Sequence, residues 1–267
     1  MFGFLNGLDS DIQQTLLKQL RDLWTHTSTA IEGNTLSLGD TKFILEEGLT
    51  VSGKPVKDHQ EVIGHARAIE LIYSLIGREI TESDLFDLHK AIHTEVVTDI
   101  DKPYGAWKVE PNGTYALDDD GKQVFIEYTS PGEVPAMMGR IIDFINDSSE
   151  PVVALEQAPA LYAKIHMGIA HVHPFWDGNG RIARLVSNIP LLNSGLPPIV
   201  IPIEGRREYI ETLARYQREV GMITSHTGVW PQEAKLSEFT NFCAKSYEST
   251  MQLVKQAQAQ QKLRYGL

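Results

Sequence analysis

Apolar residues recur every three to five positions through most of the chain, and this spacing constrains the fold more than any other feature of the sequence. A recurrence of this kind places apolar side chains along one face of an α-helix. The first predicted helix begins at Asp9 or Ser10 and ends where Gly33 and Asn34 break the pattern. Its apolar face comprises Ile12, Leu16, Leu17, Leu20, Leu23 and Trp24. The spacing therefore predicts an all-α fold.

Further helices are predicted in nearly every other part of the chain. Their ranges are 42–47, 58–77, 81–98, 134–145, 155–172, 179–193, 206–220 and 236–261. We interpret Asp58 as an N-cap and expect Val96 on the buried face of its helix. The glutamine-rich end, residues 256–267, is expected to fray. Helices are thus expected at both ends of the chain, with the last turns of the final one loose.

One stretch, residues 105–131, lacks helical spacing. A turn-forming run of three aspartates and a glycine at 118–121 precedes a β-prone run that contains Val124, Phe125, Ile126 and Tyr128. Turn residues beside such a run are typical of two antiparallel strands. The sequence therefore predicts one β-hairpin within an otherwise helical chain.

Charge and cysteine content exclude several classes of protein. The 267 residues carry 24 Lys and Arg against 35 Asp and Glu, which gives a formal net charge of −11. This balance argues against nucleic-acid binding, which relies on clustered basic residues. The single cysteine, Cys243, excludes an intramolecular disulfide and a multi-cysteine zinc site and fits a cytoplasmic protein. No apolar run approaches bilayer length, so we expect neither membrane insertion nor secretion.

The most informative segment is residues 171–184, which read His-Val-His-Pro-Phe-Trp-Asp-Gly-Asn-Gly-Arg-Ile-Ala-Arg. Residues 178–180 form a glycine-rich turn directly before a predicted helix, so backbone N–H groups at that helix N-terminus point outward. Such a position binds phosphate. Arg181 and Arg184 are three residues apart, hence on one helix face, and can contact the same anion.

Two side chains earlier in this segment add the chemistry of a transfer reaction. Asp177 offers a hard carboxylate oxygen suited to a magnesium ion that bridges phosphate oxygens. His173, followed by the rigid Pro174, has an ordinary pKa near neutrality and can remove the proton of a hydroxyl group. Each of these features alone, such as a glycine-rich turn or a single histidine, more often has only a structural role. Together they are what transfer of a phosphate-containing group to a hydroxyl requires.

Residues 173–184 resemble the signature of Fic domain proteins, His-x-Phe-x-(Asp or Glu)-Gly-Asn-Gly-Arg-x-x-Arg, at every fixed position. The resemblance extends over a domain at 81–230 and implies a Fic-type helical core with a small β-hairpin flap. It places an N-terminal helical extension at 1–80 and a C-terminal helix at 231–267. The family pattern thus divides the chain into three parts.

The resemblance implies transfer of AMP from ATP, with Mg²⁺ as cofactor, to a Ser, Thr or Tyr hydroxyl of a target protein. His173 would be the general base and Asp177 the magnesium ligand. The implied nucleotide-binding residues are Gly178, Asn179, Gly180, Arg181, Arg184, Tyr209 and Gln217. Within this set, Arg184 would hold the γ-phosphate and Tyr209 would lie beside the adenine, while Gln217 stands where relatives often have Asn.

The predicted hairpin resembles the flap with which Fic proteins bind a target segment by strand addition. The residues that carry this resemblance are Val124, Phe125, Ile126 and Glu127. Residues 110–123 before them are longer and more acidic than the usual flap of the family. The sequence does not name the target, and self-modification and a homodimer are compatible with this interpretation.

A second motif, Ser-Thr-Ala-Ile-Glu-Gly at residues 28–33, ends the first predicted helix. A glutamate in a last helical turn faces the negative end of the helix dipole, which is unfavourable unless a cation is supplied. The motif resembles the inhibitory motif (Ser or Thr)-x-x-x-Glu-(Gly or Asn) of Fic proteins, with Ser28, Glu32 and Gly33 at its fixed positions. It implies that Glu32 pairs with Arg184 in place of the γ-phosphate. The resemblance thus implies a self-restrained enzyme, and some relatives also remove AMP.

Three other interpretations account for parts of the sequence. His171, His173 and Asp177 are residue types that bind zinc in hydrolases, although the glycine turn and the paired arginines would then be unexplained. A helical regulatory module could bind a nucleotide without turnover. Within the family, the transferred group could be UMP from UTP, or phosphate.

Overall fold

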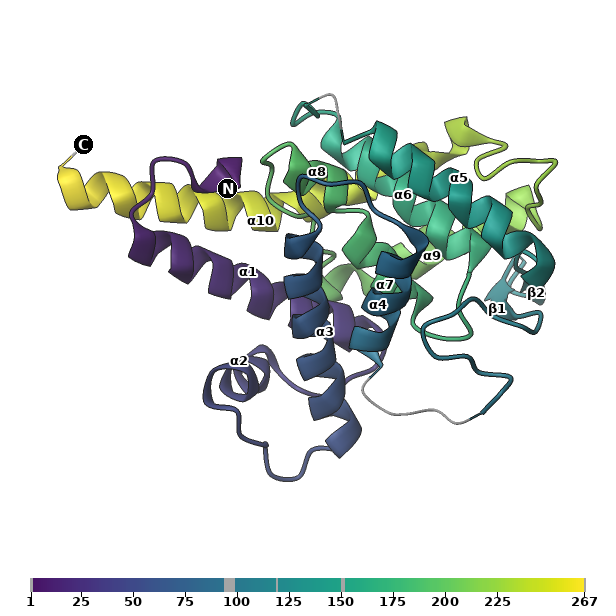
Figure 1. Cartoon of the computed structure of the whole chain (residues 1–267), viewed down its shortest axis with the longest axis horizontal. Coiled ribbons are helices and arrows are strands. Elements are labelled where there is room, and N and C mark those ends of the chain that lie inside the picture. Colours follow the sequence, from purple (N-terminus) through teal and green to yellow (C-terminus); the bar gives the residue numbers. More distant parts are fainter. Residues whose placement is uncertain (1, 94–98, 119, 150–151, 267) are drawn as a thin grey trace.

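The computed structural model describes residues 2–93, 99–118, 120–149 and 152–266. Its helices are α1 (Ser10–Ile31), α2 (Leu38–Glu47), α3 (Val56–Ser74), α4 (Glu82–Ile92), α5 (Val134–Asp147), α6 (Ala158–Val172), α7 (Asn179–Val186), α8 (Ile189–Asn193), α9 (Arg206–Val220) and α10 (Ser237–Tyr265). The two strands are β1 (Gly113–Leu117) and β2 (Gln123–Glu127). The predicted all-α class with one hairpin is confirmed (Figure 1).

Several predicted helix boundaries are wrong. The helix α2 begins at Leu38 rather than at 42, α4 ends at Ile92 before an extended His93 rather than running to 98, and α6 begins at Ala158 rather than at 155. Asp58 is not an N-cap, because α3 begins at Val56 and Asp58 lies in its first turn. The helix predicted at 179–193 is divided into α7 and α8. Pro190 has no N–H, and its ring would clash with a carbonyl one turn earlier, so one continuous helix cannot pass through it. The predicted position of Val96 lies outside the described residues.

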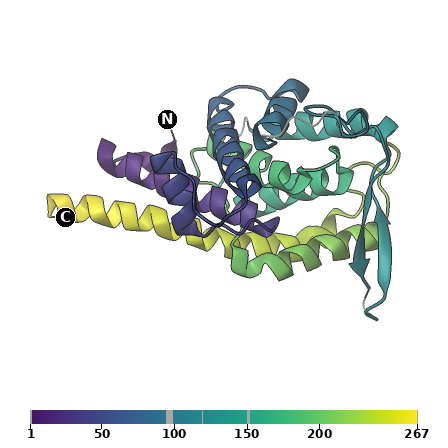
Figure 2. The same cartoon turned by 90° about the horizontal axis from the view of Figure 1, so that it is seen from below.

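The C-terminal end is ordered in a way that its composition did not indicate. Residues 256–265 continue α10 rather than fray. Arg264 contacts Asp9 at 2.7 Å and Asp11 at 2.6 Å, and the Gln261 side chain accepts a hydrogen bond from the Asp9 backbone N–H at 2.8 Å. The start of α1 therefore holds the end of α10, and Figure 2 shows these two helices side by side.

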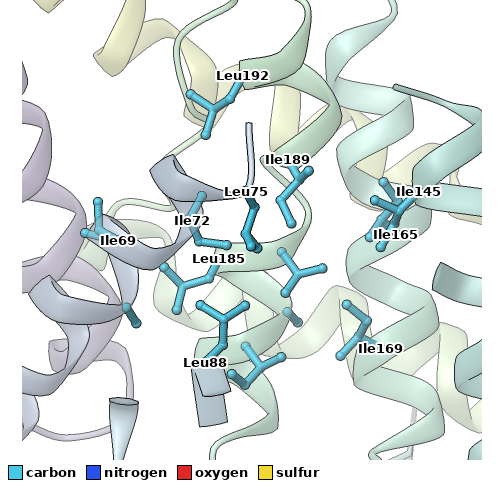
Figure 3. Close-up of a cluster of buried hydrophobic side chains, with 14 of the residues drawn as sticks. Ile69, Ile72, Leu75, Leu88, Ile145, Ile165, Ile169, Leu185, Ile189 and Leu192 are labelled. Atoms are coloured by element: carbon cyan, nitrogen blue, oxygen red, sulfur yellow. The ribbon is translucent and has the colours of Figure 1, made fainter. Parts of the chain in front are cut away.

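The main hydrophobic core forms where α3, α4, α5, α6 and α7 meet (Figure 3). Its buried residues extend from Phe4 near the start of the chain to Ala257 in α10. All three parts predicted for the chain thus contribute to one core. Their boundaries at residues 80 and 230 stay a prediction.

The hairpin stands at the end of the molecule opposite the C-terminus (Figure 2). Its antiparallel register pairs Gly113 with Glu127 and Leu117 with Gln123. A side chain at position 113 would lie 2.3 Å from the Phe125 ring and 2.6 Å from a strand carbonyl, so this position requires glycine. No helix within the described ranges combines the length and apolar character needed to cross a membrane.

Candidate active site

The loop between α6 and α7 carries the signature residues. Its first residue, His173, ends α6 with φ 51° and ψ 59°, and it is the one non-glycine residue with positive φ in the described part of the chain. Phe175 is fully buried and stacks on His89 at a ring distance of 4.1 Å. Asn179 folds back over the loop, because its side chain accepts from the Phe175 N–H and donates to the Phe175 carbonyl, both at 2.8 Å. The loop is therefore held from inside by its own residues.

His173 is oriented as a base. Its Nδ1 lies 3.3 Å from the Ala170 carbonyl, which can only accept, so Nδ1 carries the proton and Nε2 keeps its lone pair. The imidazole stacks on Tyr128 at 3.9 Å and 4°. Burial, reinforced by the positive charge of Lys108, lowers the pKa of His173 to about 4. The ring is thus neutral at pH 7 and able to take up a proton.

The N-terminus of α7 faces the same space. Gly178 precedes it with φ 80°, and the first intrahelical bond runs from the Ile182 N–H to the Gly178 carbonyl. The N–H groups of residues 179–181 therefore have no helical acceptor and are suited to an anion. A side chain at Gly180 would lie 2.7 Å from Glu32 Oε1, so only glycine leaves this approach open.

Arg184 in α7 is held by residues of α1 and α9 and by Glu32 at the end of α1. Its Nε donates to Ser28 Oγ at 3.0 Å, and its Nη1 donates to Tyr209 Oη at 3.1 Å. Its Nη2 donates to the Ser28 carbonyl at 2.9 Å and to Glu32 Oε1 at 2.6 Å. Burial opposes the charge, but Tyr209 and Glu32 outweigh it and raise the pKa of Arg184. Ser28 and Arg184, which are 156 positions apart in the sequence, thus belong to one polar network.

Glu32 reaches this network from a well-defined helix end. Gly33 has φ 100°, and its N–H bonds the Ala30 carbonyl while the Asn34 N–H bonds the Thr29 carbonyl. This pattern is a Schellman motif, which requires the left-handed conformation that glycine adopts readily. The Glu32 side chain remains 40% exposed, so its carboxylate meets the buried guanidinium from the solvent side.

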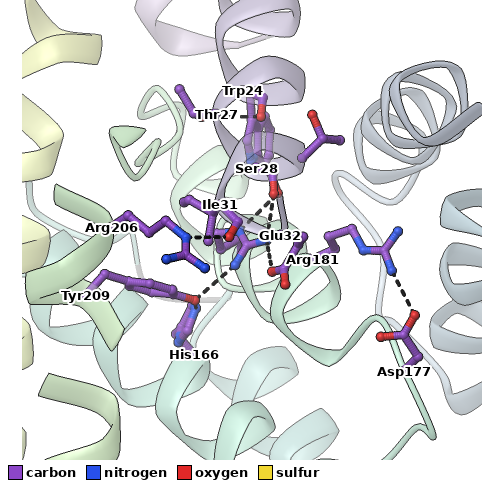
Figure 4. A network of polar contacts seen from close by, with 12 residues as sticks. Trp24, Thr27, Ser28, Ile31, Glu32, His166, Asp177, Arg181, Arg206 and Tyr209 are labelled. Atoms are coloured by element: carbon purple, nitrogen blue, oxygen red, sulfur yellow. Dashed lines mark hydrogen bonds and ion pairs between the residues drawn. The ribbon is translucent and has the colours of Figure 1, made fainter. Parts of the chain in front are cut away.

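Arg181 does not share the ligands of Arg184. Its Nη2 lies 3.3 Å from Asp177 Oδ2, and Figure 4 shows its side chain directed away from Glu32. Its Nε is buried and has no hydrogen-bond partner among the described residues. The expectation that both arginines contact one anion stays a prediction, because each guanidinium here has its own protein partners. Arg181 turns instead to the carboxylate one turn before it.

Asp177 lies at the mouth of the loop with 53% of its side chain exposed. Burial of its inner part would raise its pKa, but Arg181 and the Gly178 N–H outweigh this and lower it. Its oxygens are thus charged at pH 7 and open to solvent. One exposed carboxylate suits Mg²⁺, which keeps several waters and binds through one or two carboxylates together with phosphates.

A pocket of about 840 Å³ joins several of these elements. Its wall includes Glu32, His173, Gly180, Arg184, Tyr209 and Gln217, together with residues of β1 and α9. Such a volume is within the range of small-molecule sites. Gln217 donates to the Ala170 carbonyl at 3.1 Å, so its amide is partly engaged. Tyr209 is almost completely buried, and its hydroxyl is used by Arg184.

The hairpin closes one side of this pocket. Residues 114–117 of β1 lie on its wall, whereas the expected flap residues belong to β2. In β2, Ile126 is buried, Val124 is half-buried, and Phe125 and Glu127 are exposed. Arg218 in α9 donates to the Leu117 carbonyl at 2.6 Å and connects the hairpin to the helical core.

The residues proposed as zinc ligands do not converge. His171 is buried and its Nε2 lies 2.9 Å from the Gly221 carbonyl, while the loop turns His173 toward Tyr128. Within the described ranges, no group of three or more His, Cys, Asp or Glu residues could hold a metal ion. The geometry of these side chains therefore does not fit the hydrolase interpretation.

Three residues of the site were not identified from the sequence. Tyr128 stacks on His173, His166 lies 2.9 Å from the Tyr209 hydroxyl, and Lys108 is buried behind the loop. The Tyr209 hydroxyl thus accepts from Arg184 and lies within hydrogen-bond distance of His166 Nε2. For Lys108, the one signal in the sequence was a lysine within a segment that lacks helical spacing. The sequence does not show that this lysine is buried, because its burial depends on tertiary packing.

Comparison with known proteins places this site in a family. The sequence model of the Fic/DOC family matches residues 79–191. The chain is 36% identical over 200 residues to "Protein adenylyltransferase fic-1" of Caenorhabditis elegans, a match that covers 74% of this chain and 37% of that protein. It is 35% identical over 189 residues to "Protein adenylyltransferase Fic" of Drosophila willistoni, covering 70% and 35%. The chain thus spans little more than a third of the length of these curated relatives.

Solved structures agree with the sequence matches. A Fic domain containing signaling protein from Bacteroides thetaiotaomicron superposes with a TM-score of 0.81 at 29% identity, over 96% of this chain and 93% of that one. Fic-1 from C. elegans gives a TM-score of 0.73 at 29% identity, over 96% and 69%. The chain therefore belongs to the Fic/DOC family, with the family's domain at residues 79–191.

Proposed function

We propose that this protein is a protein adenylyltransferase that moves AMP from ATP to a Ser, Thr or Tyr hydroxyl of a target protein. The observation that carries the proposal is the free Nε2 of a neutral His173 on the wall of a pocket that also contains the N-terminal turn of α7 and Arg184. A proton acceptor, an anion cradle and a cation thus border one space. The names of the curated relatives support the same activity.

In the proposed reaction, the target hydroxyl oxygen attacks the α-phosphorus of ATP, and His173 Nε2 takes the hydroxyl proton. The bond between the α-phosphorus and the bridging oxygen to the β-phosphorus breaks, and pyrophosphate leaves. The outward N–H groups at the start of α7 stabilise charge on the phosphates. The Ala170 carbonyl keeps the proton on His173 Nδ1 and so fixes which nitrogen acts.

Magnesium fits the residues on one side of this site. The exposed, negatively charged Asp177 would hold the ion, and Arg181 beside it would contact phosphate oxygens. When bound, Mg²⁺ would neutralise phosphate charge. The buried Arg181 Nε without a partner in the described ranges supports an anion at this place.

We further propose that Glu32 restrains the enzyme. Its carboxylate occupies Arg184 Nη2 at 2.6 Å and lies against Gly180, where phosphate oxygens of ATP would need to enter. Like charge and contact with the carboxylate would both disfavour the triphosphate. Removal of AMP from a modified target is a further activity that we propose for this glutamate.

Several finer expectations stay predictions. Strand addition of a target segment to the hairpin, self-modification, a homodimer, a cytoplasmic location and the preference for ATP over UTP are among them. The donor preference has a direct test. Labelled UTP replaces ATP in the assay described next, and label from UTP alone would assign UMP transfer.

The activity is tested with Mg²⁺-ATP labelled on the α-phosphate, incubated with the protein alone and in lysate. Wild type, Glu32→Gly and the double variant Glu32→Gly with His173→Ala are compared. We expect label on protein that is stronger without Glu32 and absent without His173. Glu47→Gly, which removes an exposed glutamate at the end of α2, is the matched control and should label like wild type. Absence of label from every variant that binds ATP would refute the proposal.

A further inference from the structure

Lys108 is a buried lysine behind the catalytic loop, with 3% of its surface exposed. It belongs to residues 105–112, a segment of turns and bends between α4 and β1 that we call the strap. A buried ammonium group loses its hydration, and this loss destabilises the folded protein unless hydrogen-bond partners replace the water. The contacts of this lysine all lead to the loop that carries His173.

The strap supplies hydrogen-bond donors to a run of loop carbonyls. The Lys108 backbone N–H donates to the Pro174 carbonyl at 2.8 Å, and its Nζ donates to the Val172 carbonyl at 3.5 Å. Lys108 Nζ also donates to the Asn112 side chain, which in turn donates to the Phe175 carbonyl at 3.1 Å. These carbonyls flank His173, whose left-handed backbone prevents α6 from continuing and satisfying them.

The ammonium group is also coupled to the imidazole through Tyr128. Lys108 Nζ lies 6.0 Å from the centre of the Tyr128 ring, and that ring stacks on His173 at 3.9 Å. A cation near the face of an aromatic ring is attracted to it. Lys108, Tyr128 and His173 thus form a layered contact in which the lysine charge bears on the protonation of the base.

We propose that Lys108 is a positioning residue for the His173 base: it fixes the loop backbone, and its charge adds to the effect of burial in disfavouring protonation of the imidazole. The proposal rests on the function proposed above and assigns it a residue outside the signature. Burial lowers the pKa of Lys108 to about 8, opposed by Glu127, so the ammonium is mostly charged at pH 7. The other charges that bear on His173 are Asp177 and Glu32, which favour its protonated form. Lys108 offsets them.

The first test removes the charge but keeps the length of the side chain. In Lys108→Met, the pKa of His173 should rise by about one pH unit from its low value, because a repelling charge is lost. The pKa is followed by NMR of the histidine rings in the full chain, with His173→Ala to assign the signal. Lys108→Arg keeps the charge and should restore the low pKa. Lys255→Met, on the exposed side of α10, is the matched control.

The second readout is transfer by the same variants in the Glu32→Gly background. For Lys108→Met we expect a ~10- to 100-fold lower kcat with nearly unchanged KM for ATP, because the base is misplaced but the nucleotide site is intact. The acid limb of the rate profile should move up with the His173 pKa, since the base is lost as pH falls through that value. If the Glu32→Gly parent transfers no label, the proposed function fails, while the NMR titration still decides the role of Lys108. An unchanged His173 pKa in Lys108→Met, or an equal loss in Lys108→Arg, would overturn the proposal.

Discussion

Arg181 and Arg184 lie one turn apart on α7, and both are buried, yet their surroundings differ. Arg184 donates four hydrogen bonds, to Ser28, Glu32 and Tyr209. Arg181 has one contact, at 3.3 Å, and its Nε has no partner in the described part of the chain. The Arg184 guanidinium therefore has four of its five N–H groups engaged by the protein, whereas that of Arg181 has one.

This difference illustrates two reasons why a protein retains a buried charged side chain. A charge with several fixed partners contributes to the structure, whereas an incompletely paired one costs stability and is retained for a ligand. The Arg184 contacts come from α1 and α9, so they join distant segments. The Arg181 contact comes from its own loop. We infer that ATP completes Arg181 but has to displace a protein group from Arg184.

Replacing each arginine by methionine should give opposite results, and this is the largest effect we expect. Arg184→Met should lower the free energy of unfolding by about 3 kcal/mol, because buried partners in α1 and α9 lose their donor. Arg181→Met should be neutral or stabilising, because an incompletely paired charge gives way to an apolar side chain of similar length. Urea unfolding of both variants measures this. Equal destabilisation by the two substitutions would remove the distinction.

The same region shows which features of the site can be predicted from the sequence. The signature from His173 to Arg184 is contiguous, so its residue types and spacing identify the site without tertiary information. The contact between Glu32 and Arg184 was expected from a motif and is present at 2.6 Å. The direction of Arg181 was not predicted, because helix spacing alone does not reveal that Asp177 competes for it.

The fold shows the same division between local and distant causes. Local apolar spacing located α9 at its observed bounds, Arg206–Val220. The order of the last turns of α10 depends on Arg264 meeting residues more than 250 positions away, which no local pattern contains. The role of Lys108 was missed for the same reason, since the loop carbonyls that it contacts lie 64 or more residues later.

The variant Glu32→Gly removes the protein group that competes with ATP for Arg184. In Glu32→Gly, Arg184 keeps its bonds to Ser28 and Tyr209, so we expect a change in unfolding free energy of less than about 1 kcal/mol. Affinity for a non-hydrolysable ATP analogue should rise about tenfold, as is typical of releasing one charge-assisted contact. Calorimetry measures the affinity, with Glu47→Gly as the control. Unchanged affinity would mean that Glu32 does not compete with phosphate.

The smallest structural effect is expected on the Arg181 side. The contact between Asp177 and Arg181 is long and half-exposed, so Asp177→Asn should change the free energy of unfolding by less than about 0.5 kcal/mol. Removal of the carboxylate should nevertheless weaken the dependence of ATP-analogue binding on Mg²⁺, because the amide is a poorer ligand for a hard cation.

This prediction is measured by titrating the ATP analogue with Mg²⁺ and again after chelation with EDTA. In wild type, chelation should weaken binding, and in Asp177→Asn that loss should be at least about threefold smaller. Asp143→Asn, at an exposed position of α5, should behave like wild type. If Asp177→Asn and wild type respond equally to chelation, Asp177 does not bind the metal. The weak contact of Arg181 would then have to be explained by the protein alone, and the two arginines would no longer differ in purpose.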